Sequence, residues 1–422
     1  MPPTLGPPLF MSALRLSARP QSVHRSLTRG GRAGHLSLGG AIVIGVIFAL
    51  WLALHRVPWL GPLLADTGRV VLGARAVATA EDVAYGLDDR WQRFWRRDEA
   101  PATYWEVPTI ESHEVQSRLV RTSTAMQVRF RFPPPEVGAV HAMMHARGDG
   151  TWVPIRPEGS PTDPVVMAKT LLHPDARRPW SAVAIVAIDL SEVNLHLKAG
   201  QYVPEATEPQ AQGVRRPGLI PIEHQDRLLA AFNGGFKTVH GKLGMRADGV
   251  TLIGPQSFAC TVAGFNDGKV DVASWSRLVP RITDMQWYRQ TPRCLVEEGK
   301  RAEGLDNPQL ADWGNGVSGT TIIRRSAIGI SGDQRTLFYA LGESISAANI
   351  ALALTHAGAT TVAQLDVNGT LPKFLVYDRV GPKRRLVPRG LIDTVIFTRD
   401  EYVREPAPRD FFYLTRAEGT RI

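Results

Sequence analysis

The hydrophobic pattern of the chain changes abruptly near its start. Residues 36–54 read LSLGGAIVIGVIFALWLAL and contain no charged side chain. A helix of this length rises about 28 Å, close to the thickness of a bilayer core, because each residue adds roughly 1.5 Å. The h-region of a cleavable signal peptide is shorter, about 7–15 residues, and Leu63-Leu64-Ala65 is a poor cleavage site. The pattern predicts one transmembrane anchor, with a cleaved signal peptide as the alternative.

A second apolar pattern, with helical spacing, follows between Asp82 and Arg97. Its apolar residues recur every three or four positions, as on one face of a helix. They are Val83, Leu87, Trp91, Phe94 and Trp95. Two interpretations stay open: an interfacial helix that lies against lipid with the tryptophans as anchors, or a helix packed on the folded body.

The remaining sequence alternates in short apolar segments that predict strands. A single amphipathic helix is expected at residues 347–356, and residues 204–221 read as a polar, proline-rich loop. Many strands with few helices predict an α+β fold: a mixed, multi-stranded β-sheet domain, preceded by one N-terminal transmembrane helix. The expected strands are residues 115–120, 126–132, 141–153 (with a turn), 182–190, 228–232, 251–253, 258–263, 270–273, 320–324, 327–330, 336–341 and 394–397.

These patterns divide the chain into five segments. A transmembrane anchor follows a basic cytoplasmic tail, and a juxtamembrane and accessory region leads into the α+β domain. A C-terminal tail ends the chain. The boundaries are 1–35, 36–54, 55–180, 181–400 and 401–422.

The positive charge lies mostly before the predicted anchor. The net charge is +9, but six arginines precede the first acidic residue, Asp66, and the rest of the chain carries only +3. A nearly balanced body does not need nucleic acid as a partner. By the positive-inside rule, the N-terminus stays in the cytoplasm of a bacterium and the main domain lies outside its cytoplasmic membrane.

The cysteines and histidines predict no metal site and no cofactor. Cys260 and Cys294 are the only cysteines, and we expect two buried free thiols, although export from the cytoplasm allows one bridge. The histidines show no metal-ligand spacing. The common nucleophile, zinc-protease and nucleotide-binding motifs are also absent from the sequence.

Polar chemistry is concentrated where predicted strands end. Asp366, Asn368 and Thr370 follow the apolar approach Ala363-Gln364-Leu365, with Gly369 allowing a turn. A carboxylate, an amide and a hydroxyl at the end of a buried strand are typical of an enzyme site mounted on a rigid scaffold.

Two other segments offer groups for binding. Asn233 ends an apolar strand, and Gly234 and Gly235 let the backbone approach a ligand closely, with Lys237 nearby. Taken alone, an ordinary Asn-Gly turn is the favoured interpretation of that segment. Arg325 enters an apolar strand, and its planar guanidinium suits phosphate or carboxylate, although a solvated strand-end arginine is the simpler interpretation.

Together, the order of these segments resembles the phosphodiester glycosidase domain family over about residues 185–400. The matching segments, in chain order, are residues 187–190 (AIDL), 232–237 (FNGGFK), Arg289-Gln290, residues 325–329 (RSAIG) and Leu365-Asp366. The better-known family pattern continues as Gly-Gly-Gly-Ser, whereas this chain has Val-Asn-Gly-Thr at residues 367–370. Some bacterial members are similar to this variant.

The resemblance implies hydrolysis of a sugar-1-phosphodiester at its glycosidic bond. Asp366 would be the nucleophile or the electrostatic stabiliser of an oxocarbenium-like centre, and Arg325 would neutralise the phosphate. Asn233 and the amides of Gly234 and Gly235 would hold an anion or sugar hydroxyls. Substrate contacts are also expected from residues 368–370 and Lys237, and Glu343 is the candidate second carboxylate.

Three functional classes follow. The favoured one is a membrane-anchored hydrolase acting on a glycan or glycosyl phosphate of the cell envelope. The second is a catalytically silent glycan-binding module on the same fold. The third is a structural member of an envelope complex, which would use residues 57–180, and the sequence names no protein partner for it.

Overall fold

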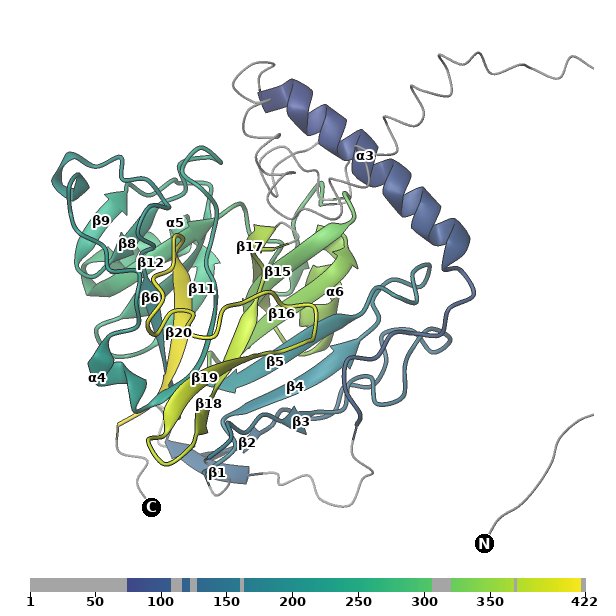
Figure 1. The fold of residues 1–422 in the computed structure, drawn as a ribbon, viewed down its shortest axis with the longest axis horizontal. Coiled ribbons are helices and arrows are strands. Elements are labelled where there is room, and N and C mark those ends of the chain that lie inside the picture. The colour runs from purple at the N-terminus through teal and green to yellow at the C-terminus, as the bar shows by residue number, and fades with distance from the viewer. Residues whose placement is uncertain are drawn as a thin grey trace, which may run out of the picture. The chain divides into compact units, whose positions relative to one another are not determined.

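The computed structural model describes residues 74–107, 116–121, 127–159, 163–305, 320–367 and 370–418 (Figure 1). The predicted cytoplasmic tail and anchor, residues 1–54, lie outside them, as do Asn368 and Gly369. The chain divides into two compact units, residues 1–57 and 58–422, and the described residues belong to the second. None of the described helices is both long and apolar enough to cross a membrane.

The described body is mostly β-sheet with few helices, as the α+β prediction expected. The expectation of a mixed sheet is wrong for the described residues, because their named strand pairs are antiparallel. The largest sheet has eight strands, in the order β14 (Lys300–Arg301), β13 (Val296–Glu297), β17 (Thr361–Val367), β15 (Ile323–Ile330), β16 (Thr336–Ile345), β5 (Val183–Asp189), β4 (Met167–Leu172) and β3 (Val153–Pro154).

Two five-stranded sheets and a hairpin complete the β-structure. One sheet has the order β19 (Arg385–Gly390), β18 (Phe374–Val380), β7 (Leu228–Asn233), β20 (Phe411–Arg416) and β6 (Val193–Lys198). The other has the order β11 (Val270–Ser274), β10 (Cys260–Phe265), β12 (Met285–Thr291), β8 (Met245–Ala247) and β9 (Val250–Ile253). Strands β1 (Gln116–Arg121) and β2 (Gln127–Phe132) pair with each other.

The central strands of the eight-stranded sheet are buried on both faces, and β5 shows why such a strand has a continuously apolar sequence. Alternate side chains of a strand point to opposite faces. Ala184, Val186 and Ile188 join the large core formed with the five-stranded sheets. The intervening residues of β5 join a second core beneath helix α6 (Ala347–His356). A strand buried on both sides needs apolar residues at every position.

The helices are few and their ends follow local chemistry. Helix α6 spans the residues that the sequence predicted, and its N-cap Ser346 accepts a hydrogen bond from the backbone of Asn349 at 3.1 Å. Gly358, with φ of +112°, ends it. The other helices are α3 (Ala74–Trp95), α4 (Ile222–Gln225), α5 (Trp275–Leu278) and the 3₁₀ turns η1 (Pro209–Ala211) and η2 (Val279–Asp284).

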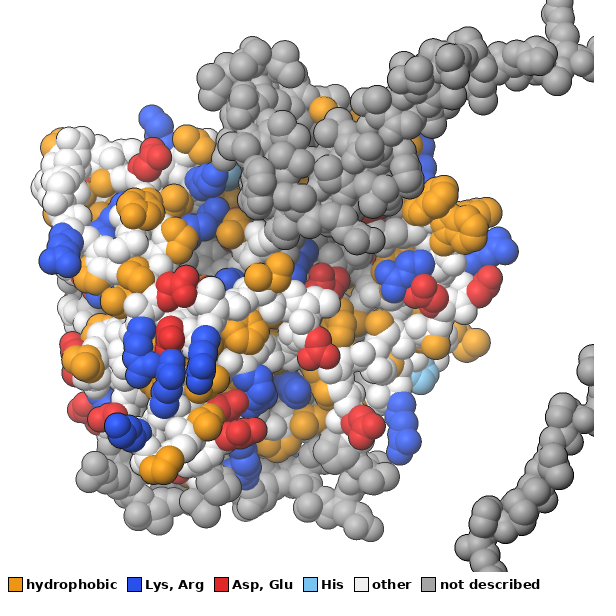
Figure 2. All heavy atoms as spheres, in the orientation of Figure 1, with side chains coloured by type: hydrophobic (Ala, Val, Ile, Leu, Met, Phe, Trp, Pro, Cys, Tyr) orange, Lys and Arg blue, Asp and Glu red, His pale blue; other side chains and the backbone are white. Residues whose placement is uncertain are grey.

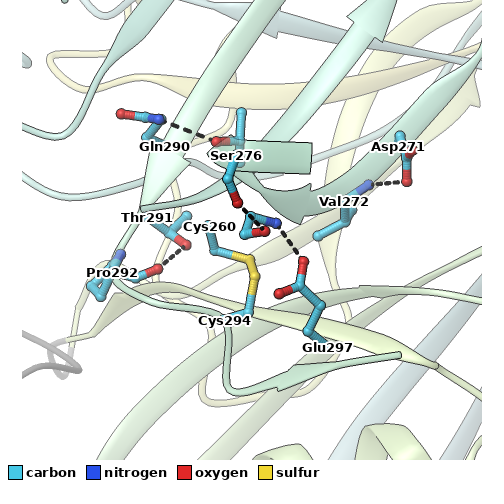
Figure 3. The surroundings of a disulfide bond; sticks show 11 residues. Cys260, Asp271, Val272, Ser276, Gln290, Thr291, Pro292, Cys294 and Glu297 are labelled. Carbon is cyan, nitrogen blue, oxygen red and sulfur yellow. Dashed lines mark hydrogen bonds between the residues drawn. A yellow bond between two sulfur atoms is a disulfide. The ribbon is translucent and has the colours of Figure 1, made fainter. Parts of the chain in front are cut away.

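The two cysteines form a disulfide, so the prediction of free thiols was wrong (Figure 3). Strands β10 and β12 are antiparallel neighbours that pair Cys260 with Thr291. The chain leaving β12 therefore brings Cys294 beside Cys260, with their Cα atoms 4.8 Å apart. The bond joins β10 of one sheet to the segment that precedes β13 of another.

Three other expectations differ from the structure. Residues 394–397 form no strand: Val395 and Phe397 pack on the core, whereas Ile396 is exposed. Within residues 141–153, turns and one isolated bridge replace the expected strand, and β3 begins only at Val153. The boundary at residue 180 divides a single sheet, because β4 pairs with β5 along its whole length.

The expected C-terminal tail is part of the core. Strand β20 lies between β7 and β6 and pairs with both, and residues 411–414 are buried. The expected separation at residue 400 is therefore wrong for the described residues up to 418.

Candidate active site

Asn233 ends β7 with its side chain buried and completely hydrogen-bonded. Its Oδ1 accepts hydrogen bonds from the Tyr339 hydroxyl at 2.9 Å and from the Lys373 backbone at 3.1 Å. Its Nδ2 donates to Ser326 Oγ at 2.9 Å and to the carbonyl oxygen of Gly234 at 3.2 Å. These bonds use both donors and both acceptor positions of the amide. Asn233 therefore fixes the end of the strand instead of presenting free groups to a ligand.

Asp366, near the end of β17, lies beside this amide network. Its backbone N–H donates to the Gly234 carbonyl at 3.1 Å, and its own carbonyl accepts a hydrogen bond from Ser326 Oγ at 2.9 Å. Ser326 thus connects Asp366 directly to Asn233. The structure brings together two candidates that are far apart in the sequence.

The carboxyl group of Asp366 is buried and asymmetrically bound. Oδ1 accepts the backbone N–H of Val367 at 3.0 Å, while Oδ2 pairs with Nη2 of Arg409. Burial raises the pKa of Asp366 to about 6, although the positive charge of Arg409 opposes this shift. The negative charge of Asp410 raises the pKa further. Desolvation is the dominant effect, and it disfavours the charged form.

Gly234 and Gly235 are needed because a buried ion pair lies against them. Arg289 Nε donates to Asp410 Oδ2 at 2.8 Å, and both side chains are fully buried. The same oxygen accepts the Gly235 N–H at 2.9 Å. A Cβ atom at Gly234 would lie 2.1 Å from Asp410 Oδ2, and one at Gly235 would lie 2.9 Å from Arg289 Cζ. The double glycine permits a close backbone approach, here to the protein's own charges.

Arg325 is separated from this cluster by the alternation of its strand. Ser326 faces Asn233, so the neighbouring Arg325 points to the opposite face of the sheet. There its guanidinium donates to Gln364 Oε1 at 2.7 Å and to the carbonyl oxygens of Ile345 and Thr321 at 3.1 and 3.0 Å. Arg325 is completely buried. The arginine that contacts Asp366 is Arg409.

Glu343 belongs to a different polar group. It accepts a hydrogen bond from the Thr394 hydroxyl and lies 3.6 Å from Nη2 of Arg324, an arginine that also donates to the Thr394 carbonyl at 3.1 Å. Burial, followed by the charge of Glu343, raises the pKa of Tyr104. Among the interactions of the described residues, none joins Glu343 to Asp366.

The other expected substrate contacts lie at the margins of the cluster. Lys237 is half-buried in the turn after β7, where its carbonyl accepts the backbone N–H of His240 at 2.9 Å. Thr370 is half-buried in the turn after β17. Asn368 and Gly369 lie outside the described residues.

Sequence reasoning missed Arg409 and Asp410 because it assigned them to a tail. The available signal was an Arg-Asp pair placed directly before the apolar run Phe411-Phe412-Tyr413-Leu414. Such a pair lies at the start of a buried strand, whereas Asp366 was identified at the end of one. Arg409 also donates to the Gly235 carbonyl at 3.3 Å, so it connects β20 to both glycine and carboxylate.

A surface hollow of about 360 Å³ lies beside Pro406, three residues before Arg409 in the chain. Tyr202, Arg215 and Arg216 are among its lining residues. Desolvation lowers the pKa of Arg216, and the negative charge of Asp410 opposes that shift. A larger hollow of about 450 Å³ at the β18–β19 hairpin contains none of the candidate residues. Within the described residues, no group of His, Cys, Asp or Glu is arranged to hold a metal ion.

Comparisons with known proteins give similarities of fold only. No family model matches the chain, and no curated protein is similar to it in sequence. Among solved structures, it is similar to the catalytic domain of zebrafish N-acetylglucosamine-1-phosphodiester α-N-acetylglucosaminidase auto-inhibited by its pro-peptide. That match has 15% identity and a TM-score of 0.38, and it covers 62% of this chain and 87% of the other.

Two further solved structures are similar at lower identity. A hypothetical protein from Synechocystis has 10% identity and a TM-score of 0.34, with 72% of each chain covered. A putative exported protein from Burkholderia pseudomallei has 10% identity and a TM-score of 0.31, covering 56% of this chain and 74% of the other. Similarities of this size do not assign an activity.

Proposed function

We propose that the protein is a membrane-anchored hydrolase that acts outside the cytoplasmic membrane on a glycosyl phosphodiester of envelope glycan. The observation that carries the proposal is the setting of Asp366. Its carboxyl group is buried, has a raised pKa and contacts a cation. Asp366 lies near the end of its strand, where Ser326 hydrogen-bonds its carbonyl oxygen. Perturbed carboxyl groups in such settings are typical of functional sites.

In the proposed reaction, the bond between C1 of the sugar and the phosphodiester oxygen breaks. The phosphate monoester departs with the bonding electron pair, and water supplies hydroxide to C1 and a proton to the solution. A phosphate leaving group needs little protonation, so one carboxylate is enough to stabilise or trap the oxocarbenium-like centre. This agrees with the structure, in which Glu343 pairs with Arg324 and Asp366 pairs with Arg409.

Arg409 is the cation that we assign to the phosphate in this scheme. Its contacts to Asp366 and Gly235 both use Nη2, which leaves Nε and Nη1 for a phosphate oxygen. Its side chain keeps 17% of its surface exposed, so it is more accessible than Arg289 or Arg325. Asn233 acts as a positioning residue. The hollow with Tyr202 and Arg216 offers an aromatic face and a cation to the rest of a glycan.

The proposed compartment has independent support from the disulfide. Bonds of this kind persist in oxidising surroundings and are rare in the cytoplasm. The pairing of Cys260 with Cys294 therefore favours a location of the body outside the cytoplasm. The arginine-rich segment before residue 36 favours the same orientation.

The experiment is a hydrolysis assay of the detergent-solubilised full chain on a panel of sugar-1-phosphodiesters. We expect release of the free sugar, and loss of this activity in Asp366→Asn. The matched control is Asp378→Asn, because Asp378 is also buried and paired with an arginine, at 2.8 Å from Arg389. Full activity in a folded Asp366→Asn variant would contradict the assignment of Asp366.

The second candidate is a glycan-binding module without turnover. The specific observation that favours it is the 5% exposure of Asp366, which limits the approach of a substrate. The two candidates predict different results from the same panel. Binding of glycan fragments without release of sugar would support the module and contradict the hydrolase.

A further inference from the structure

Helix α3 exposes its apolar face. Side chains spaced three or four residues apart form one stripe along the helix. Their exposed fractions are 58% for Val83, 59% for Leu87, 60% for Trp91, 63% for Phe94 and 63% for Trp95. Figure 2 shows hydrophobic side chains gathered over the C-terminal end of α3. An apolar stripe normally faces the core, so this helix is inverted.

The polar side of the helix faces the folded body and is fixed there. Arg178 donates from Nε and Nη2 to the two carboxylate oxygens of Asp89, at 2.7 and 2.8 Å. Arg178 also pairs with Asp175, and it is only 5% exposed. The guanidinium of Arg96 lies 5.1 Å from the ring centroid of Trp180.

These contacts fix the orientation in which the apolar face of α3 points outward. Rotating the helix to bury its tryptophans would break a largely buried, bidentate ion pair and leave Arg178 without Asp89. Breaking this pair is unfavourable, because Nε and Nη2 of the buried guanidinium would lose their acceptors while Asp175 would keep only Nη1 paired. The body therefore holds the apolar stripe outward.

We infer that the stripe formed by Val83, Leu87, Trp91, Phe94 and Trp95 lies in the interfacial region of a lipid bilayer. Tryptophan is enriched where hydrocarbon meets water, since its ring is apolar and its N–H is polar. The helix begins twenty residues after Leu54, the last residue of the predicted anchor. This inference depends on the proposed function in one respect: the proposed transmembrane anchor brings the helix to the membrane.

The charges near the stripe indicate that no anionic lipid is required. Between Asp88 and Glu99, four arginines are balanced by four acidic residues. Binding should therefore depend on buried apolar area, and a neutral phosphatidylcholine bilayer is the appropriate test surface. A helix lying in the interface would also hold the folded body against the membrane, through Asp89 and Arg178.

The disulfide permits a site-specific test on the full chain. Because both native cysteines are bonded to each other, Leu87→Cys introduces one free thiol for an environment-sensitive fluorophore. The labelled protein is reconstituted in phosphatidylcholine vesicles, with or without doxyl-labelled lipid as a quencher. We expect a blue-shifted emission that the doxyl lipid quenches. The control is Met143→Cys, whose position lies in a turn and is 95% exposed, and we expect neither effect there.

Other outcomes separate the alternatives. A blue shift without quenching would mean that protein covers the stripe, which would overturn the inference. Equal behaviour of the labels at positions 87 and 143 would overturn it as well. Adding Trp91→Glu to the Leu87→Cys protein should reduce the quenching if the stripe enters lipid. Flotation of the vesicles reports the anchor, and sugar release reports the hydrolase, so failure of either is distinguishable from failure of the stripe.

Discussion

At the residue scale, the proposed reaction places two opposing demands on Asp366. Burial disfavours its charged form, whereas stabilising an oxocarbenium-like centre requires that form. A pKa of about 6 is a compromise, since the carboxylate is ionised at neutral pH and still strongly desolvated. The ion pair with Arg409 keeps the shift from being larger.

This setting predicts opposite pH dependences for activity and stability. Hydrolysis should rise as pH increases through about 6 and then reach a plateau, because Asp366 must be ionised. The folded-state pKa lies above the ordinary value of 3.8, so the contribution of Asp366 to stability is complete below that value. It is lost as pH rises through about 6.

The measurements are kcat/KM and the free energy of unfolding between pH 4 and 8. Asp366→Asn should remove its part of the pH dependence of stability, while Asp378→Asn should retain the wild-type slope in this window. Activity that falls with increasing pH near 6 would instead assign Asp366 the role of an acid.

The sequence could identify Asp366 and Asn233, but it could not select the arginine. Both candidates end buried strands, a position visible in the apolar approach to each. Because side chains alternate along a strand, either Ser326 or Arg325 can face β7, but not both. The sequence alone does not say which, since that depends on how the sheets pack. Arg409 was hidden because its partners lie far away in the sequence.

At the scale of elements, strands buried on both faces were easier to predict than half-buried ones. Strand β5 and helix α6 have strong apolar patterns, and the structure confirms both. Strand β6 alternates buried and half-buried residues, and its polar positions masked it. Strand β12 contains the buried Arg289 and Gln290, which resemble loop residues until their buried partners are known.

The disulfide between Cys260 and Cys294 is the clearest energetic prediction at this scale. The bond closes a loop with a sequence separation of 34 residues. A loop of this length corresponds to roughly 4 kcal/mol of stability through the restricted unfolded chain. The double variant Cys260→Ala/Cys294→Ala should therefore have a lower free energy of unfolding by about this amount.

The measurement is urea unfolding followed by circular dichroism, with and without reductant. Reductant should destabilise the wild type and leave the double variant unchanged. An equal effect of reductant on both proteins would show that the bond does not form in solution.

At the scale of the whole molecule, strand β20 is needed to complete one of the five-stranded sheets. It lies between β6 and β7, and Asp410 at its start holds the buried Arg289. Truncation after residue 400 should abolish the cooperative unfolding transition, because it leaves two open strand edges and an unpaired buried charge. Calorimetry of the truncated chain measures this.

The matched control is truncation after Glu418, which retains every described residue and should preserve the transition. A cooperative transition after removal of residues 401–422 would restore the interpretation of this segment as a tail. The five-segment division failed here because sequence patterns are local, whereas the partners of β20 lie about 180 residues or more before it.

The placement of β20 has a further consequence for biogenesis. Strands β6 and β7 leave the ribosome long before the strand that separates them, so their facing edges remain unpaired during synthesis. Folding of this sheet must therefore wait for residues 411–416, and the high contact order makes it slow. Until that last strand is made, the unpaired edges of β6 and β7 would depend on chaperones to keep them from pairing with other chains.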